Sequence, residues 1–295
     1  MANMIEPRGI SANAPQKQGC GYRSMISDVS GPCDVSKWNV LPIASSGRYP
    51  KIFLQYGNAK FMIKFAEQTQ SKLFIPYHVS EYVSCRVCKN LGYDVQEVAM
   101  ASFHGLECVL IQLFEEQLTM ISGLGSSTLS GEKLNYDLDA LCGIIKESKF
   151  AFDVEGYMWD TFFIDAFVSN LDRHPNNWGF FKRIDNLYYK APLYDFGNSL
   201  FSLNANALGK MARIPEYCRK YGNSLIKYHG ERTSFHSIIQ SETSEKFDES
   251  HKRFRQRLLS FDFEVISGLT RYWPQWSAYG EFLKKYFCWQ ISEMA

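Results

Sequence analysis

Three polar residues between positions 169 and 201 are of the types that bind a divalent metal ion and activate a hydroxyl group. Asp172 and Asn177 stand in one polar cluster, and Asp195 follows in a second. Mg²⁺ prefers hard oxygen ligands and usually binds one or two carboxylates together with phosphate oxygens. Asn177 and Asp195 therefore fit as metal ligands, and Asp172 fits as the carboxylate that orients an incoming hydroxyl. Together they predict phosphoryl transfer from a magnesium–ATP complex, a reaction that depends on positioning and charge.

The spacing of Asp172 and Asn177 equals that of the catalytic Asp and the metal-binding Asn in the protein-kinase loop HRDxxxxN. Both residues also have an ordinary explanation, because Asn and Asp are common in turns. His174 could take part in catalysis by orienting Asp172 or the loop backbone, or it could be a hydrogen-bonded structural histidine. Arg173 could hold the loop electrostatically or contact phosphate.

A second pair of residues, more than a hundred positions before Asp172, could bind the nucleotide. Lys64 lies between apolar neighbours in the predicted strand MIKF and could contact the α- and β-phosphates of ATP. Glu81, on the next predicted helix, is the carboxylate that would pair with it. Each has a plain alternative: Lys64 could extend to solvent along the sheet, and Glu81 could interact with the helix N-terminus.

Two further predictions complete the nucleotide site. A small-residue loop between strands could cradle phosphates with its backbone N–H groups, although one glycine between strands is often only a turn. Its residues are Ser45, Ser46, Gly47 and Arg48. Leu113 and Phe114 end a predicted strand, and backbone groups there would meet adenine.

The apolar pattern predicts an α+β fold that begins with strands and continues with helices. A helix is expected from Ser80, as its cap, to a stop at Gly92, which places Glu81 in the first turn. Strands are expected at 38–44, 51–56, 60–65, 95–101 and 107–113, the first three forming an antiparallel unit.

The second half of the chain is predicted to be mostly helical. Helices are expected at 137–147 and 155–169, a hairpin of 178–181 with 187–189 follows, and the region 209–290 is helical with breaks near Gly222, Gly230, Ser260-Phe261 and Pro274. The expected organisation is an irregular tail at 1–37, an N-terminal lobe at 38–121, a linker at 122–136 and a C-terminal lobe at 137–295. The linker is no Walker A loop, because Gly125 and Gly131 enclose five residues and Glu132 follows.

The composition is that of an ordinary globular protein. Charged residues make up 21% and the net charge is +1, so no nucleic-acid or anionic-membrane partner is indicated. The eight scattered cysteines are expected to be buried thiols in a reducing compartment. No apolar run reaches membrane-spanning length and no secretory signal is visible, which favours the cytoplasm, with export by a signal-independent route left open. The basic run 251–257 is expected to be a solvated helix face or a surface for an anionic partner.

The two site motifs resemble those of the HipA-like serine/threonine kinases, and among these the short, stand-alone CtkA-like members. The family's loop reads approximately N-x-D-R-H-x-x-N-W-G and its later strand A-P-x-x-D. Here these are Asn170, Asp172, Arg173, His174, Asn177, Trp178 and Gly179, then Ala191, Pro192 and Asp195, with Lys64 and the segment from Ser80 to Cys85 also matching.

The resemblance covers about 42–201 and implies a bilobal kinase fold that uses Mg²⁺ and ATP. It implies Asp172 as catalytic base, Asn177 and Asp195 as metal ligands and Lys64 on the phosphates. It also implies a protein serine or threonine as substrate, with autophosphorylation at Ser45 or Ser46, and an antitoxin-like or host protein as a possible partner. HRD order, GxGxxG and APE motifs are absent from the sequence, so substrate docking would differ from eukaryotic kinases.

Two other functions remain open from the sequence. Lipid kinases of related fold also use a D-R-x-x-x-N loop, which leaves a phosphoinositide or small-molecule kinase as one alternative. An inactive nucleotide-binding module, acting as a toxin–antitoxin partner or an effector, is the other. Acceptor specificity separates the first from a protein kinase, and ATP binding without transfer would identify the second.

Overall fold

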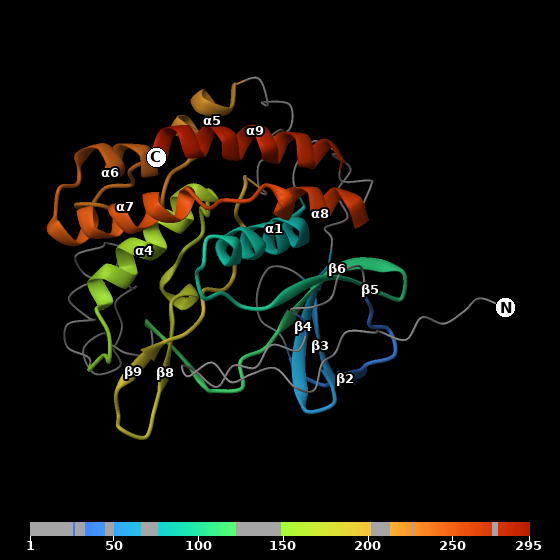
Figure 1. Ribbon diagram of the computed structural model, residues 1–295. Helices are drawn as coiled ribbons and strands as arrows, with labels where there is room; N and C mark the ends of the chain where they lie inside the picture. The colour runs from blue at the N-terminus through green and yellow to red at the C-terminus, as the bar shows by residue number, and fades with distance from the viewer. Residues whose placement is uncertain are drawn as a thin grey trace.

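The computed structural model describes residues 26, 33–44, 50–65, 76–121, 149–201, 213–225, 227–272 and 277–295. A sheet with one helix forms the part of the molecule built from the first half of the chain, and a group of helices forms the other (Figure 1). The expected α+β class, with strands first and helices later, is confirmed.

A mostly antiparallel sheet carries Lys64. Its order is β1-β5-β6-β4-β3-β2, so β4 lies inside the sheet and is hydrogen-bonded on both sides. The predicted antiparallel unit is confirmed in β2, β3 and β4, although its first strand is shorter than 38–44. The strands are β1 Cys33–Asp34, β2 Asn39–Leu41, β3 Lys51–Tyr56, β4 Ala59–Phe65, β5 Val98–Phe103 and β6 Leu106–Gln112.

The assignment of 1–37 to an irregular tail was wrong at its end. Cys33 and Asp34 form β1, which pairs in parallel with Ala101 and Ser102 of β5. A segment of two residues is too short to show the alternation of apolar and polar residues that predicts a strand. This strand forms by pairing with β5, which is distant in the sequence.

Helix α1 (Tyr77–Asn90) carries Glu81 and starts earlier than expected. Its N-cap is Pro76, so the prediction that Ser80 caps the helix was wrong, and Glu81 lies in the second turn rather than the first. The Ser80 hydroxyl instead donates a hydrogen bond to the carbonyl of Ser199, at 2.7 Å. A proline fits at a helix start because the first N–H groups have no partner within the helix.

The predicted hairpin is confirmed and forms part of a second small sheet. Strands β8 (Gly179–Lys182) and β9 (Tyr188–Lys190) pair antiparallel, and β7 (Leu118–Met120) adds to the other side of β8. The described helices of the second half are α4 Val154–Phe167, α5 Ile214–Tyr221, α6 Phe235–Ser241, α7 Glu245–Leu258, α8 Glu264–Tyr272 and α9 Ser277–Met294, with the 3₁₀ turn η1 at Pro175–Asn177.

The predicted helix breaks at Gly222, Gly230 and Ser260-Phe261 fall between these helices, as expected. The break at Pro274, the helix at 137–147 and the linker at 122–136 lie outside the described residues.

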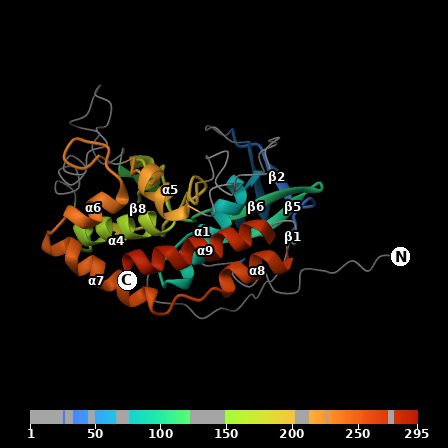
Figure 2. The same ribbon diagram turned by 90° about the horizontal axis from the view of Figure 1, so that it is seen from above.

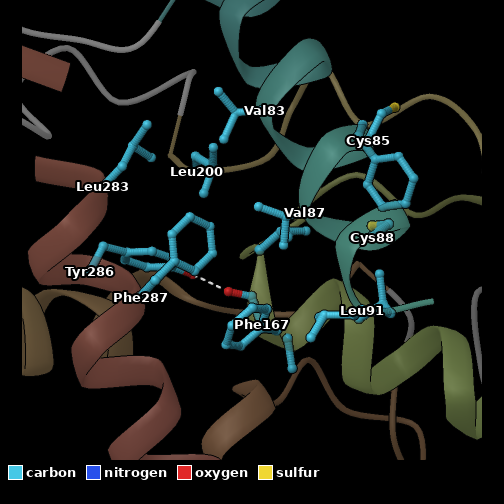
Figure 3. Packing of buried hydrophobic residues seen from close by; sticks show 14 of the residues in the cluster. Val83, Cys85, Val87, Cys88, Leu91, Phe167, Leu200, Leu283, Tyr286 and Phe287 are labelled. Atoms are coloured by element: carbon cyan, nitrogen blue, oxygen red, sulfur yellow. Dashed lines mark hydrogen bonds between the residues drawn. The ribbon is translucent and has the colours of Figure 1, made fainter. Parts of the chain in front are cut away.

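One apolar core joins α1 to the C-terminal helices. Val83 and Val87 of α1 face Phe167 of α4 and Leu283 and Phe287 of α9 (Figure 3), all with almost no exposed surface. Seen from above, α8 and α9 run beside α1 (Figure 2). A separate cluster covers the opposite face of the sheet. Helix α1 is therefore held between the sheet and the helical part, which places Glu81 where the two meet.

Within the described ranges, no helix is both long and apolar enough to cross a membrane. The described cysteines are free thiols, and those at 85, 88, 108 and 218 are buried as expected. The expectation of burial was wrong for Cys288, which is exposed, and Cys33 is only partly buried.

Candidate active site

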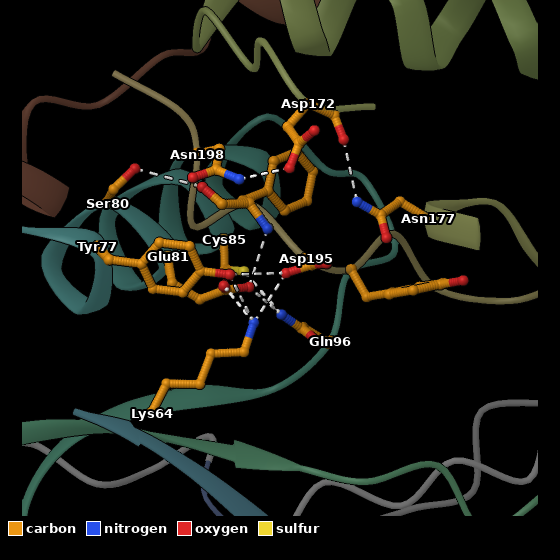
Figure 4. Close-up of polar contacts among 12 residues, drawn as sticks. Lys64, Tyr77, Ser80, Glu81, Cys85, Gln96, Asp172, Asn177, Asp195 and Asn198 are labelled. Carbon is orange, nitrogen blue, oxygen red and sulfur yellow. Dashed lines mark hydrogen bonds and ion pairs between the residues drawn. The ribbon is translucent and has the colours of Figure 1, made fainter. Parts of the chain in front are cut away.

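Three charged residues from three separate elements meet at one point (Figure 4). The Lys64 Nζ atom on β4 lies 2.9 Å from Glu81 Oε2 on α1 and 2.8 Å from Asp195 Oδ1, which follows β9. Lys64 and Glu81 are buried, at 6% and 0% exposure, while the Asp195 side chain keeps 34% of its surface exposed. Asp195 is thus the most exposed of the three side chains, and Lys64 and Glu81 lie deeper in the structure.

The charges at this point stabilise one another. Burial alone would lower the pKa of Lys64, but the carboxylates of Glu81 and Asp195 outweigh it and hold that pKa well above its ordinary value. Burial likewise opposes ionisation of Asp195, yet the Lys64 ammonium lowers the pKa of that carboxyl to about 2. Buried charges are tolerated when they are paired and hydrogen-bonded. Lys64 and Asp195 are therefore both charged at neutral pH.

Two residues that the sequence reasoning missed complete this cluster. Tyr77 Oη accepts a hydrogen bond from Lys64 Nζ at 3.2 Å and donates one to Asp195 Oδ1 at 3.1 Å. Glu81 Oε1 accepts one from the backbone N–H of Phe196, at 2.9 Å, and another from the side chain of Gln96. Neither Tyr77 nor Gln96 stands in a recognisable motif, so sequence offered no signal for them.

Gly197 allows Tyr77 to lie against the segment that follows Asp195. A Cβ atom at position 197 would lie 1.9 Å from Tyr77 Cζ, a separation that real atoms do not show. The ring would have to move, and its hydrogen bonds to Lys64 and Asp195 would be lost.

We expect Gly197→Ala to lower the free energy of unfolding by about 1–3 kcal/mol, the usual cost of overpacking a tight site. Urea unfolding followed by circular dichroism measures this. Gly268→Ala is the matched control, because a Cβ there meets nothing within 4 Å and alanine favours a helix. Equal stability of the two variants would contradict the close contact.

The loop that carries Asp172 is held in place by a buried ion pair. Arg173 makes two hydrogen bonds of 2.9 Å to the Asp165 carboxylate on α4. It also donates to the carbonyls of Asn177, at 2.9 Å, and Tyr194, at 2.8 Å. Of the two roles considered for Arg173, holding the loop is the one its contacts support, since only 2% of the residue is exposed. Asp165, an acid between the apolar residues Ile164 and Ala166 of α4, was the signal that sequence reasoning overlooked.

The same loop presents Asp172 and Asn177 toward Asp195. Asn177 Nδ2 donates to the Asp172 carbonyl at 3.1 Å, and Asn198 Nδ2 donates to Asp172 Oδ2 at 2.5 Å. These contacts leave Asn177 Oδ1 and Asp195 Oδ2 without a hydrogen-bond partner among the described residues. Two hard oxygen atoms are what a Mg²⁺ ion shared with a nucleotide requires of a protein. Among the residues described, His, Cys, Asp and Glu form no cluster of three or more that could hold a metal by themselves.

Of the other predicted site residues, His174, Leu113 and Phe114 make contacts that the structure describes. The backbone of His174 makes two hydrogen bonds of 2.8 Å within the loop. Its N–H donates to the Asp172 carbonyl, and its carbonyl accepts from the Asn177 N–H. The Leu113 N–H donates a hydrogen bond to the Lys60 carbonyl at 2.9 Å. The Phe114 ring packs edge-on against Phe181, with centroids 5.5 Å apart. The predicted phosphate loop of Ser45, Ser46, Gly47 and Arg48 lies outside the described residues.

Comparison with known proteins is consistent with this geometry. The serine/threonine-protein kinase CtkA of Helicobacter pylori strain J99 is 29% identical over 162 residues, which are 51% of this chain and 50% of that protein. In sequence, the chain therefore spans about half the length of the curated relative that it matches.

Solved structures show that the fold is that of a kinase. The crystal structure of a Helicobacter pylori proinflammatory kinase CtkA superposes with a TM-score of 0.75 and 22% identity, over 88% of this chain and 95% of that one. HipA of Shewanella oneidensis MR-1, solved with HipB and operator DNA, gives a TM-score of 0.50 and 14% identity, over 85% of this chain and 64% of that one. Finally, the family model of the HipA-like C-terminal domain matches residues 43–258, which is well over half of the sequence. The chain therefore belongs to the family of HipA-like C-terminal domains.

Proposed function

We propose that this protein is a serine/threonine protein kinase that transfers the γ-phosphoryl group of ATP, bound with Mg²⁺, to a protein hydroxyl. The observation that carries the proposal is the meeting of Lys64, Glu81 and Asp195, with Lys64 Nζ 2.9 and 2.8 Å from the two carboxylates. A buried lysine held by a helix carboxylate beside a partly exposed aspartate is the arrangement that kinases use to hold phosphates and metal.

The chain's own residues have separate tasks in this reaction. Lys64 binds the α- and β-phosphates, and Asn177 and Asp195 provide the oxygen ligands of the metal. Magnesium, when bound, would neutralise charge on the phosphates. Asp172 accepts the proton of the incoming hydroxyl as that oxygen bonds to the γ-phosphorus. The bond from the γ-phosphorus to the β,γ-bridging oxygen breaks, and ADP leaves with the electron pair.

The choice of protein rather than lipid as acceptor rests on the family and on charge. The named relative CtkA is a serine/threonine-protein kinase, and the net charge of +1 gives no attraction to anionic lipid. Autophosphorylation at Ser45 or Ser46 is part of this proposal. An antitoxin-like partner is also part of it, because a structure of similar fold was solved with HipB. The free thiols and the lack of a spanning helix in the described part fit a cytoplasmic site of action, and signal-independent export is the alternative.

The proposal is tested by incubating the purified full chain with γ-labelled ATP and Mg²⁺, alone, with casein or myelin basic protein, and with phosphoinositide vesicles. Label on serine or threonine of the chain itself or of the added protein is the expected result, and mapping shows whether Ser45 or Ser46 carries it. Lipid labelling that exceeds protein labelling would identify a lipid kinase instead. ATP binding without transfer to any of these acceptors would identify an inactive nucleotide-binding module.

A further inference from the structure

The C-terminal end of α1 is attached to α7 through Arg257. The guanidinium Nη1 of Arg257 donates a hydrogen bond to the carbonyl of Leu91 at 2.7 Å, across 166 positions of sequence. Its Cζ atom also lies 4.3 Å from the centre of the Tyr93 ring. Leu91 is the C-cap of α1. The last carbonyls of a helix lack partners within it and carry partial negative charge, so a cation there stabilises the helix end.

The chain leaves room for this contact. Gly92 has φ +74°, and a Cβ atom at that position would lie 2.8 Å from Arg257 Nη1. Glycine at position 92 therefore allows the left-handed turn that ends α1, and it leaves space for the Arg257 guanidinium. Next to it, Asn90 Oδ1 accepts a hydrogen bond from the backbone N–H of Asp262, at 2.9 Å.

The rest of the basic run 251–257 is mostly used in packing. His251 stacks on Phe163 with ring centres 4.9 Å apart, and Arg253 pairs with Asp160 at 2.9 Å. Arg255 is exposed and makes no hydrogen bond or ion pair with the part of the chain that the structure describes. The run is thus neither a uniform solvated face nor a continuous cationic surface, because alternate arginines point to structural partners.

The position of Arg257 matters because α1 carries Glu81. One end of the helix is fixed to the segment after Asp195, through the Ser80 hydroxyl and the Ser199 carbonyl at 2.7 Å. The other end is fixed where Arg257 contacts Leu91. Leu91 lies ten residues beyond Glu81, which is roughly 15 Å along a helix. A helix held at both ends cannot tilt about the first contact, and a misplacement of about 1 Å at a site can cost roughly a hundredfold in rate.

We propose that Arg257 is a positioning residue, which attaches α1 to the helical part of the molecule and so keeps Glu81 at the distance from Lys64 that phosphate binding requires. The inference deepens the proposed kinase function and rests on it for its effect on rate. The attachment itself can be measured without any activity.

The experiment compares Arg257→Gln with Arg255→Gln, a matched control on the same helix. Hydrogen–deuterium exchange of the amides at 84–92 is measured in the full chain, and phosphoryl transfer is measured in parallel. We expect faster exchange and at least a tenfold lower kcat, with a smaller change in the KM for ATP, in Arg257→Gln only. Arg257→Lys keeps the charge but not the planar group on Tyr93, so its exchange rate and its kcat should both lie between those of the wild type and Arg257→Gln. If Arg257→Gln does not fold, the same comparison of amide exchange and kcat is made between Arg257→Lys and Arg255→Gln.

A double-mutant cycle with Glu81→Gln separates positioning from general destabilisation. If Arg257 acts through Glu81, Arg257→Gln changes kcat little once Glu81 is replaced, so the two effects are not additive. Additive losses would overturn the proposal, as would unchanged exchange at 84–92. If the wild-type chain transfers no phosphate, the kinase function fails, and the exchange measurement still decides whether Arg257 holds the helix.

Discussion

Asp172→Asn is expected to reduce phosphoryl transfer by roughly 10²–10⁴-fold, the range that a positioned general base contributes. Asparagine has nearly the same shape as aspartate, so it can still accept the Asn198 hydrogen bond. The contact from Asn177 goes to the backbone carbonyl of residue 172, at 3.1 Å, and is independent of the side chain. The loop should therefore keep its conformation while losing the group that accepts the proton. Single-turnover labelling at saturating ATP measures the loss, and calorimetry should show unchanged nucleotide affinity.

His174→Asn is the comparison for this result, because His174 lies in the same loop and was also considered for catalysis. Its backbone groups make the loop contacts, at 2.8 Å, and any residue can supply them. We expect a loss smaller than tenfold, about 1.4 kcal/mol of barrier. Labelling by Asp172→Asn at the wild-type rate would exclude Asp172 as the base. A His174→Asn loss as large as that of Asp172→Asn would instead make the histidine side chain an equal participant.

Asp195→Asn is expected to abolish magnesium-dependent turnover, with a loss of about 10³-fold or more. A metal that stabilises charge on a transferring phosphoryl group supplies several kcal/mol, and each 1.36 kcal/mol is a tenfold change in rate. The substitution removes the partly exposed carboxylate proposed as a ligand and one of the two negative charges that lie within 3 Å of Lys64. Titration of ATP with and without Mg²⁺ should show that the metal no longer strengthens binding, while turnover is followed with labelled ATP.

Asp185→Asn is the matched control, at the turn of the hairpin that precedes Asp195. Asp185 is exposed at the turn, where its Oδ1 accepts a hydrogen bond from Leu187 N–H and its Oδ2 accepts one from the Tyr189 hydroxyl. Asparagine keeps an oxygen for the Leu187 N–H, and its amide NH₂ can donate to the Tyr189 oxygen instead. We expect wild-type turnover and wild-type magnesium dependence from this variant. Retention of magnesium-dependent transfer in Asp195→Asn would contradict the assignment of Asp195 as a metal ligand.

The candidate residues of the site could be identified from the sequence because residue type and local order mark them. Asp172 and Asn177 lie in one short loop, and Asp195 follows the hairpin after it, so their relation is set by a few neighbouring turns. Lys64 was recognisable as a charge inside an apolar strand. The α+β class and the order of strands and helices followed from the same apolar periodicity. The roles of these residues in catalysis stay predictions until the variants are measured.

What the sequence did not predict depends on contacts between distant segments. The β1 strand pairs with the distant strand β5. Helix α1 starts at Tyr77, so Ser80 lies inside the helix and its hydroxyl bonds to the distant Ser199 carbonyl. Tyr77 and Asp165 were missed for the same reason, since neither belongs to a motif and each acts on a residue far away or in another element. The lobe boundaries at 38–121 and 137–295 stay predictions, because much of the connecting region lies outside the described residues.

By itself, then, the sequence determined which side chains could carry out phosphoryl transfer and the kinds of element on which they stand. Only the tertiary structure decided that Lys64, Glu81 and Asp195 meet within 3 Å, that Arg173 holds the loop from inside, and that Arg257 attaches α1 to α7. The physical reason is that strands and helices follow from periodic local patterns. The pairing of charges from separate elements depends on how those elements pack, and the packing is set by the shared core between the sheet and the helices.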